Sequence, residues 1–123
     1  MRPCVFFADT ERIQEFLPHP YFKKYRKEKE RLKITTRGIL PLGAAYEDYA
    51  TEAYKDVRGE ARPKLKFIPQ NQFPFKGEIT VYGDDRVSII NLEADQPVAF
   101  IIEDASFHKM MRNIFYLVWA GIR

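Results

Sequence analysis

The residues able to do chemistry are few and scattered in this sequence. It contains two histidines, His19 and His108, and a single cysteine, Cys4. Neither histidine has a second histidine or a carboxylate at metal-ligand spacing, and no phosphate loop, dinucleotide-binding glycine motif or nucleophilic serine motif is present. We therefore expect surface or capping roles for the histidines and a small core residue in Cys4. No catalytic residue, metal or cofactor is predicted.

Polar residues at the ends of predicted strands are better candidates for a binding site. In an open α/β sheet, ligands bind beyond the carboxyl ends of the parallel strands. We predict that three strands, over 4–8, 34–40 and 65–68, end at such an edge. The residues expected there are Asp9, Thr10, Pro41, Leu42, Gly43, Gln70 and Asn71. They indicate a rim for a small ligand and specify no reaction.

Arg37 is a charged residue inside a predicted strand. The run 34–40 is otherwise strand-like, so this guanidinium must reach water, a ligand or a carboxylate partner. Two interpretations stay open. Arg37 either forms a structural ion pair with an acid or lines the ligand site.

A strongly basic stretch, residues 20–33, is predicted to be a helix. Clustered lysine and arginine release counterions from a polyanion, so this helix is a candidate nucleic-acid or phosphate surface. A solvated outer helix face has the same pattern, and only Glu28 and Glu30 oppose the positive charge. The basic face comprises Lys23, Lys24, Arg26, Lys27 and Arg31, with Lys29 and Lys33 beside them.

The composition is that of one folded domain, residues 1–123. The chain is 46% apolar and 15% aromatic, which supports a buried core and argues against disorder. Its net charge of +3 permits an acidic partner without requiring one. A single cysteine cannot form an internal disulfide and favours a reducing, cytoplasmic setting. No apolar stretch approaches the roughly 18 residues of a membrane span, so no membrane partner is expected.

The order of predicted elements indicates a mixed α/β sheet of about six strands with helices on its faces. A strand, two short helices and a returning strand form a parallel unit, and a further helix and strand follow. Three antiparallel strands and a final helix complete the chain. The strands are predicted over 4–8, 34–40, 65–68, 78–82, 86–92 and 97–102, and the earlier helices over 10–17, 20–33 and 44–57. The strand 97–102 is apolar on both sides of its pleat, which predicts cover on both faces.

The final helix follows Asp104 or Ser106, either of which can cap it. From 114 to 120 it is apolar nearly all round, which is more than one sheet face needs. Such a helix is either buried in the core or shared with a second subunit, and a homodimer is the usual symmetric arrangement. The residues assigned to this core or dimer helix are Phe107, Met111, Ile114, Phe115, Val118 and Trp119.

Several segments together resemble the effector domain of TrmB-type transcriptional regulators. The early ones are V-F-F at 5–7, E-F-L-P at 15–18, I-T-T-R-G-I-L-P at 34–41 and K-F-I-P at 66–69. The later ones are E-I-T-V-Y-G-D-D-R-V-S-I-I-N-L at 78–92, V-A-F-I-I-E-D at 98–104 and I-F-Y-L-V-W at 114–119. The resemblance covers nearly the whole chain, and it lies in the order and spacing of these segments.

The resemblance implies half of a phospholipase D-like fold. That fold's active site uses H-x-K followed after four residues by Asp, and the matching strand here has Glu78 and Thr80 at the His and Lys positions. Without the nucleophilic histidine, a non-catalytic domain is expected, one that senses a small molecule such as a sugar, or dimerises, or does both. Glu78 and Thr80 join the candidate ligand-binding residues on this basis.

Such regulators carry a winged helix-turn-helix ahead of this domain, and no stretch here has the pattern of a recognition helix followed by a wing. DNA binding is therefore expected only through a missing or separate domain. Two other functions remain open: a nucleic-acid-binding accessory protein that uses the basic helix, and a diverged phosphodiesterase-like hydrolase.

Overall fold

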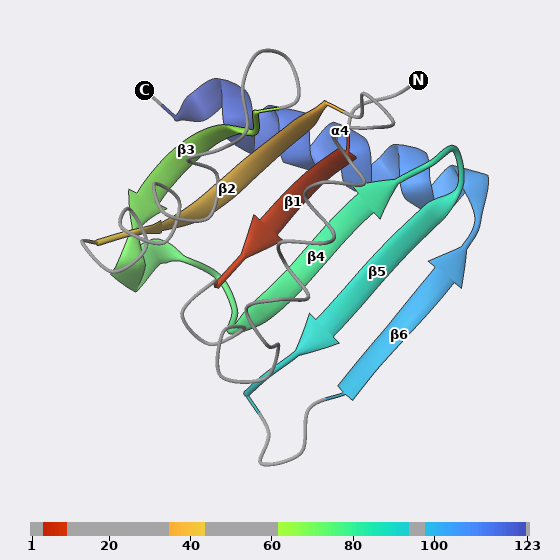
Figure 1. Ribbon diagram of the computed structural model, residues 1–123, viewed down its shortest axis with the longest axis horizontal. Coiled ribbons are helices and arrows are strands. Elements are labelled where there is room, and N and C mark those ends of the chain that lie inside the picture. The colour runs from red at the N-terminus through yellow and green to blue at the C-terminus, as the bar shows by residue number, and fades with distance from the viewer. Residues whose placement is uncertain (1–3, 10–34, 44–61, 94–97, 123) are drawn as a thin grey trace.

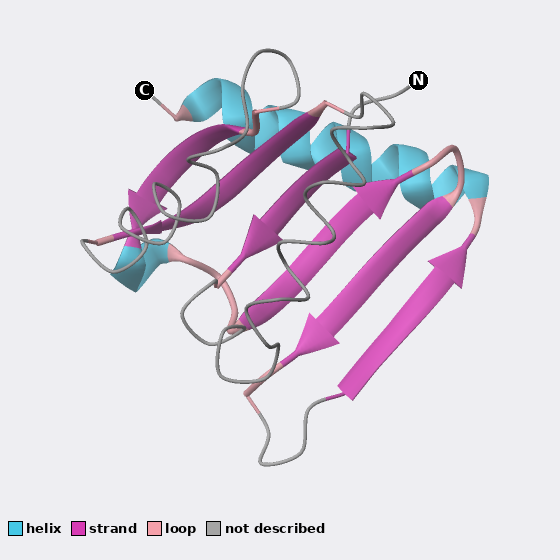
Figure 2. Ribbon diagram, viewed as in Figure 1, coloured by secondary structure: helices cyan, strands magenta, loops and turns pink. Residues whose placement is uncertain are grey.

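The computed structural model describes residues 4–9, 35–43, 62–93 and 98–122. These residues form one six-stranded mixed sheet with a long helix, α4 (Ala105–Gly121), lying across one of its faces (Figures 1 and 2). The predicted α/β class, the mixed sheet and the C-terminal helix are confirmed. The helices expected over 10–17, 20–33 and 44–57 lie outside the described residues.

The sheet combines a parallel half with an antiparallel half. β1 pairs with β2, and β2 with β3, in parallel, whereas β4 runs antiparallel to β1 and continues through β5 to β6. The order across the sheet is β3-β2-β1-β4-β5-β6, so β3 and β6 are its edges. The strands are β1 (Cys4–Ala8), β2 (Thr36–Leu42), β3 (Lys64–Pro69), β4 (Gly77–Tyr82), β5 (Arg86–Asn91) and β6 (Val98–Glu103).

β2 continues past residue 40, where the predicted strand ended. Pro41 and Leu42 belong to the strand and pair with Ile68 and Pro69 of β3. The pairing of β2 with β1 stops at Ile39, so Pro41 lies where β2 has a partner only on the β3 side. A proline, which lacks an N–H, is tolerated in a strand where no ladder bond is required of it.

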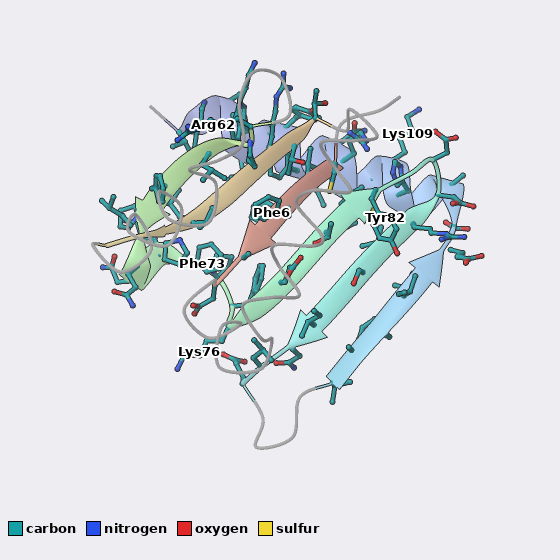
Figure 3. All side chains as sticks on the ribbon, in the orientation of Figure 1. Phe6, Arg62, Phe73, Lys76, Tyr82 and Lys109 are labelled. Atoms are coloured by element: carbon teal, nitrogen blue, oxygen red, sulfur yellow. The ribbon has the colours of Figure 1, made fainter. Side chains whose placement is uncertain are left out.

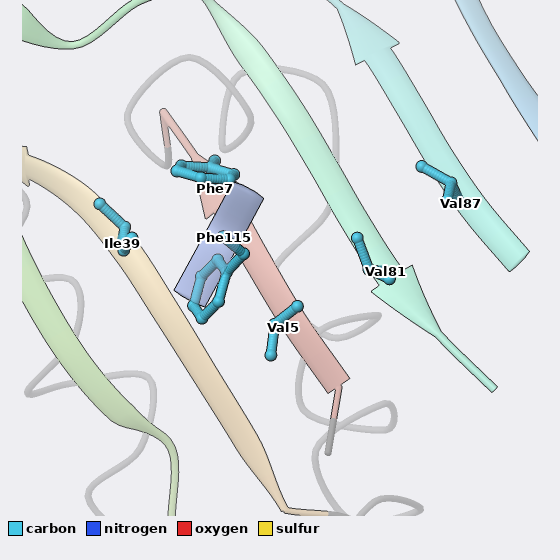
Figure 4. Packing of buried hydrophobic residues seen from close by; sticks show 6 residues of the cluster. All are labelled: Val5, Phe7, Ile39, Val81, Val87 and Phe115. Atoms are coloured by element: carbon cyan, nitrogen blue, oxygen red, sulfur yellow. The ribbon is translucent and has the colours of Figure 1, made fainter. Parts of the chain in front are cut away.

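α4 packs on the sheet through Phe115, which is fully buried. Its ring meets Phe7 edge-on, with centroids 5.3 Å apart, and stacks on Trp119 at 5.6 Å. Figure 4 shows Phe115 close to side chains from β1 and β2. The buried residues of this core cluster are Val5, Phe7, Ile39, Val81, Val87 and Phe115. Burial of these large side chains against one another is the main source of stability on this face.

Both ends of α4 are fixed by hydrogen bonds. Of the two predicted caps, Asp104 is the one observed. Its carboxylate accepts a 2.7 Å hydrogen bond from the Phe107 N–H. At the other end, the Lys66 ammonium of β3 donates to the carbonyls of Trp119 (2.8 Å) and Ile122 (3.0 Å). A cation is favourable there because the last carbonyls of a helix carry partial negative charge. The same ammonium lies 4.6 Å from the centre of the Trp119 ring.

The face of the sheet turned away from α4 is apolar as well. Its buried cluster consists of Phe6, Ala8, Leu40 and Leu92. Phe6 is paired with Gly38 in the neighbouring strand, and Figure 3 shows its ring on this face. A Cβ atom at Gly38 would lie only 2.2 Å from Cζ of Phe6, so the aromatic ring occupies the space that a side chain at position 38 would need.

β6 is not buried on both faces, although its apolar sequence had predicted this. Within the described part of the chain it pairs with β5 alone, and its side chains are largely exposed: 52% for Val98, 47% for Phe100 and 61% for Ile101. The expectation of a strand buried on both faces was therefore wrong. An apolar run without alternation identifies a strand but does not reveal which strands or helices surround it.

Gly38→Ala is expected to destabilise the fold because the new methyl group would collide with the Phe6 ring. Overpacking of this kind costs about 1–3 kcal/mol of unfolding free energy, measurable by denaturant titration. Gly121→Ala is the matched control, since a Cβ there meets nothing within 4 Å, and its effect should stay within about 0.5 kcal/mol. Equal unfolding free energies for the two variants would contradict the placement of Phe6 over Gly38.

Candidate functional site

The predicted rim residues are brought to one edge of the sheet. Asp9 follows β1, Gly43 follows β2, and Gln70 and Asn71 form the short helix η2 (Gln70–Gln72) directly after β3. Because β1, β2 and β3 are parallel, their carboxyl ends lie at the same edge (Figure 1). Asp9 and Gly43 are partly exposed, whereas Gln70 and Asn71 are exposed. Thr10 lies outside the described residues.

Backbone hydrogen bonds and aromatic packing hold this edge in place. The Asp9 N–H donates to the Gly77 carbonyl at 2.9 Å, which joins the end of β1 to the start of β4. Phe73, whose N–H donates to the Gln70 carbonyl at 3.3 Å, packs its ring against Phe75 with centroids 5.3 Å apart. Both phenylalanines pack against the α4-side core. The residues next to the polar rim are therefore held in place by packing against the apolar core.

Glu78 and Thr80 are neighbours on β4. In the sheet register Glu78 lies opposite Ala8 and Thr80 opposite Phe6, so both belong to the face turned away from α4. The Thr80 hydroxyl donates a hydrogen bond to the Glu78 carboxylate. Glu78 is half-buried at the rim, whereas Thr80, 8% exposed, lies further inside the sheet. This pair offers hydrogen-bond acceptors to a ligand at the rim through the Glu78 carboxylate.

Arg37 is separated from the rim. It lies near the start of β2, paired with Val5 and Lys64, whereas the rim lies beyond the end of that strand. Its Nη1 donates to the Tyr116 hydroxyl at 3.1 Å, and its guanidinium carbon is 5.7 Å from the centre of the Tyr116 ring. The contact observed for Arg37 is thus with an aromatic residue of α4, which neither sequence interpretation had named.

His108 is buried, against the expectation of a surface or capping role. Its side chain is 0% exposed, and Nε2 lies 3.5 Å from Nη2 of Arg112, one helical turn later. The spacing of His108, Phe115 and Trp119 places all three on the sheet-facing side of α4. Sequence reasoning missed this because a histidine is compatible with both core and surface. Its position on the same helical stripe as Phe115 was the available signal.

The residues predicted for a core or dimer helix lie on two different sides of α4. Phe115 is buried, and Phe107, Met111, Val118 and Trp119 are partly buried against the same core. Ile114 instead belongs to the outer side, where it is 43% exposed beside Met110 (52%) and Leu117 (77%). One side of α4 is therefore core, and the outer side carries a stripe of exposed apolar residues.

Other predicted features are not addressed by the described part of the chain. Lys23, Lys24, Arg26, Lys27 and Arg31 of the basic face lie outside it. Among the described residues, no group of three or more His, Cys, Asp or Glu side chains is placed to hold a metal ion. None of the helices in residues 98–122 or the other described ranges has the length and apolarity needed to cross a membrane.

Comparison of the chain with protein-family models, curated proteins and solved structures gave no match. The resemblance to TrmB-type effector domains therefore stays a prediction that rests on the segments quoted above. The geometry of the rim and of the Glu78–Thr80 pair is therefore the basis for assigning a function.

A double-mutant cycle tests the structural assignment of Arg37. Arg37→Leu and Tyr116→Phe should each lower the unfolding free energy by about 0.5–1.5 kcal/mol, because each removes the same hydrogen bond. The double variant should lose less than the sum of the two single losses, with a coupling of about 0.5 kcal/mol or more. Strictly additive losses in urea unfolding would mean that Arg37 acts through another partner.

Proposed function

We propose that this chain is a non-catalytic regulatory domain that senses a small polar molecule at the rim of its parallel strands. The observation that carries the proposal is the convergence of Asp9, Gly43, Gln70 and Asn71 at one edge of the sheet. Open α/β sheets bind ligands at this edge because strand ends and loops present polar groups there without neighbouring strands to pair with. The proposal includes the TrmB-type character that the sequence resemblance implies.

The rim chemistry suits a ligand rich in hydroxyl groups, such as a sugar. The amide side chains of Gln70 and Asn71 each donate and accept hydrogen bonds, and the carboxylates of Asp9 and Glu78 accept them. Each hydroxyl of a sugar likewise both donates and accepts. The packed rings of Phe73 and Phe75 provide the apolar base that small-molecule sites combine with a few polar groups.

The Glu78–Thr80 pair supports a non-catalytic role. These residues stand where the resemblance places the nucleophilic histidine and the lysine of the phospholipase D-like site. A carboxylate that accepts a hydrogen bond from a largely buried threonine is a fixed polar group. A diverged hydrolase would need another nucleophile, so it is the weaker alternative.

The parallel pairs of the sheet support the finer fold assignment. Parallel neighbours require a crossover connection of a dozen or more residues, usually helical. We propose that the helices predicted over 10–17, 20–33 and 44–57 supply these crossovers, which together with α4 would give the phospholipase D-like half. In this proposal the domain acts in the cytoplasm as a homodimer, and it reaches DNA only through a separate domain.

A second candidate is a nucleic-acid-binding accessory role for the basic stretch 20–33. Seven of its residues are lysine or arginine and two are glutamate. Binding of this kind would weaken steeply as salt is added, because it depends on released counterions, whereas binding of a neutral sugar would not.

A thermal-shift screen against sugars, sugar phosphates and nucleotides tests the sensing proposal. A ligand present at about 100 times its Kd stabilises the folded state by about 2.7 kcal/mol, which raises Tm by several degrees for a domain of this size. The double variant Gln70→Ala/Asn71→Ala should keep the Tm of the free protein and lose the ligand-induced rise, since both residues are exposed.

Asn113→Ala is the matched control, because Asn113 is an exposed amide on α4, away from the rim. It should leave both Tm and the ligand response unchanged. A ligand response that survives intact in the double variant, or the failure of every compound in the screen to raise Tm, would contradict a sensor site at this edge.

A further inference from the structure

The edge strand β6 is apolar and uncovered along most of its length. Among the described strands its one hydrogen-bonded neighbour is β5, and the other side of β6 is an edge of the sheet. Five consecutive residues, 98–102, are apolar, and four of them are exposed. Their side chains alternate between the two faces of the sheet, so no single helix could cover them all. The unpaired backbone groups of such a strand form a template for another strand.

The opposite edge of the sheet is protected. β3 begins with the exposed Lys64 and ends at the exposed Pro69, whereas the ammonium of Lys66 is held at the end of α4. Charged side chains and prolines are the usual means by which proteins prevent edge strands from pairing with other chains. β6 has no such residue between Val98 and Ile102, and its single charge, Glu103, stands at the end and reaches Arg86 of β5 at 3.5 Å. The sheet therefore has one edge, β3, that is protected against pairing with another chain, and one edge, β6, that is not. We call these the closed edge and the open edge.

We propose that the open edge is occupied by β6 of a second copy of the chain, in an antiparallel ladder centred on Phe100. Because the opposite edge is closed, the pairing has to be between two β6 strands. Pairing of β6 with itself gives a closed twofold dimer, whereas pairing of β6 with β3 would give an open-ended filament. The result is one sheet that continues from the first copy into the second.

The apolar pattern of β6 fixes the register. In a continuous sheet, directly opposed residues must point to the same face, so the two positions must both be even or both be odd. Centring on Phe100 places Val98 opposite the second copy's Ile102 and Ala99 opposite its Ile101. All five opposed pairs are then apolar.

Centring on Ala99 would leave only three opposed pairs within 98–102, and two further arrangements bring charges into the ladder. Centring on Ile101 would set Glu103 opposite Ala99 and Asp104 opposite Val98. A parallel ladder would place the two Glu103 carboxylates side by side. In the proposed register they stand about six residues apart, or roughly 20 Å, at opposite ends of the ladder. That separation exceeds the screening length at physiological salt, so their repulsion is negligible.

This interface rests on the homodimer part of the proposed function and does not involve the ligand rim. It also leaves the outer stripe of α4 free. The two proposals can therefore be distinguished. A dimer without ligand binding would contradict only the sensing rim, whereas a ligand-responsive monomer would contradict the homodimer and its interface and leave the sensing rim standing.

Cysteine crosslinking of the full chain tests the register. In Phe100→Cys the two new thiols would be directly opposed, with Cα atoms about 4.5–5.5 Å apart, within the range of a disulfide. Mild oxidation should convert most of this variant to a covalent dimer on a non-reducing gel. Ala99→Cys is the matched control on the same strand, because its two thiols would be diagonal neighbours about 7–8 Å apart, too far to bond readily. The native Cys4 is 5% exposed, so the unmodified chain should stay uncrosslinked.

Sedimentation equilibrium provides a test that does not depend on the cysteine variants. The unmodified chain should sediment at twice its monomer mass of 14.5 kDa. Ile101→Lys should sediment as a monomer with an unchanged circular dichroism spectrum, because Ile101 is exposed in the single chain. Leu117→Lys, on the outer stripe of α4, should remain a dimer. A monomeric unmodified chain, or a dimer broken by Leu117→Lys and not by Ile101→Lys, would overturn the proposal.

Discussion

The contact between Phe115 of α4 and the centre of the sheet is the interaction on which the rest of the structure depends. It covers β1, β2 and β4 on one face and orients α4 between a capped beginning at Asp104 and an end held by Lys66 of β3. Because the helix is seated there, its outer stripe faces away from the sheet. β6, at the far edge, keeps little cover, and the strand ends at the rim stay open.

The pattern of apolar residues predicted the strands well, because apolar runs and alternation are local properties of the chain. The strand 4–8 was placed correctly to the residue, and the strands predicted over 78–82, 86–92 and 97–102 correspond to β4, β5 and β6. The neighbours of each strand were harder to predict because they are set by distant segments. The apolar run of β6 suggested a central strand, yet β6 is an edge. The predicted strand stopped before Pro41, yet β2 tolerates this proline beyond its last pair with β1.

The sequence predicted where the candidate site lies but not which contacts its individual polar residues make. The general behaviour of parallel strands located the rim, and the structure brings Asp9, Gly43, Gln70 and Asn71 there. Single polar residues were less predictable, since their partners lie far away in sequence. Arg37 donates a hydrogen bond to Tyr116, 79 residues later, and no local sequence pattern predicts this contact. His108 is buried on the Phe115 side of α4, where its residue type alone gave no indication of burial.

The central claim is that this sheet has one closed edge, β3, and one open edge, β6, which a second copy of the chain covers. Amide hydrogen exchange at low and high protein concentration tests it most directly, because pairing protects the backbone N–H groups of β6 that point away from β5. The account predicts that exchange in 98–103 slows as concentration rises, while exchange in 64–69 does not change. Exchange in β6 that is independent of concentration, in a chain that nonetheless forms dimers, would contradict it.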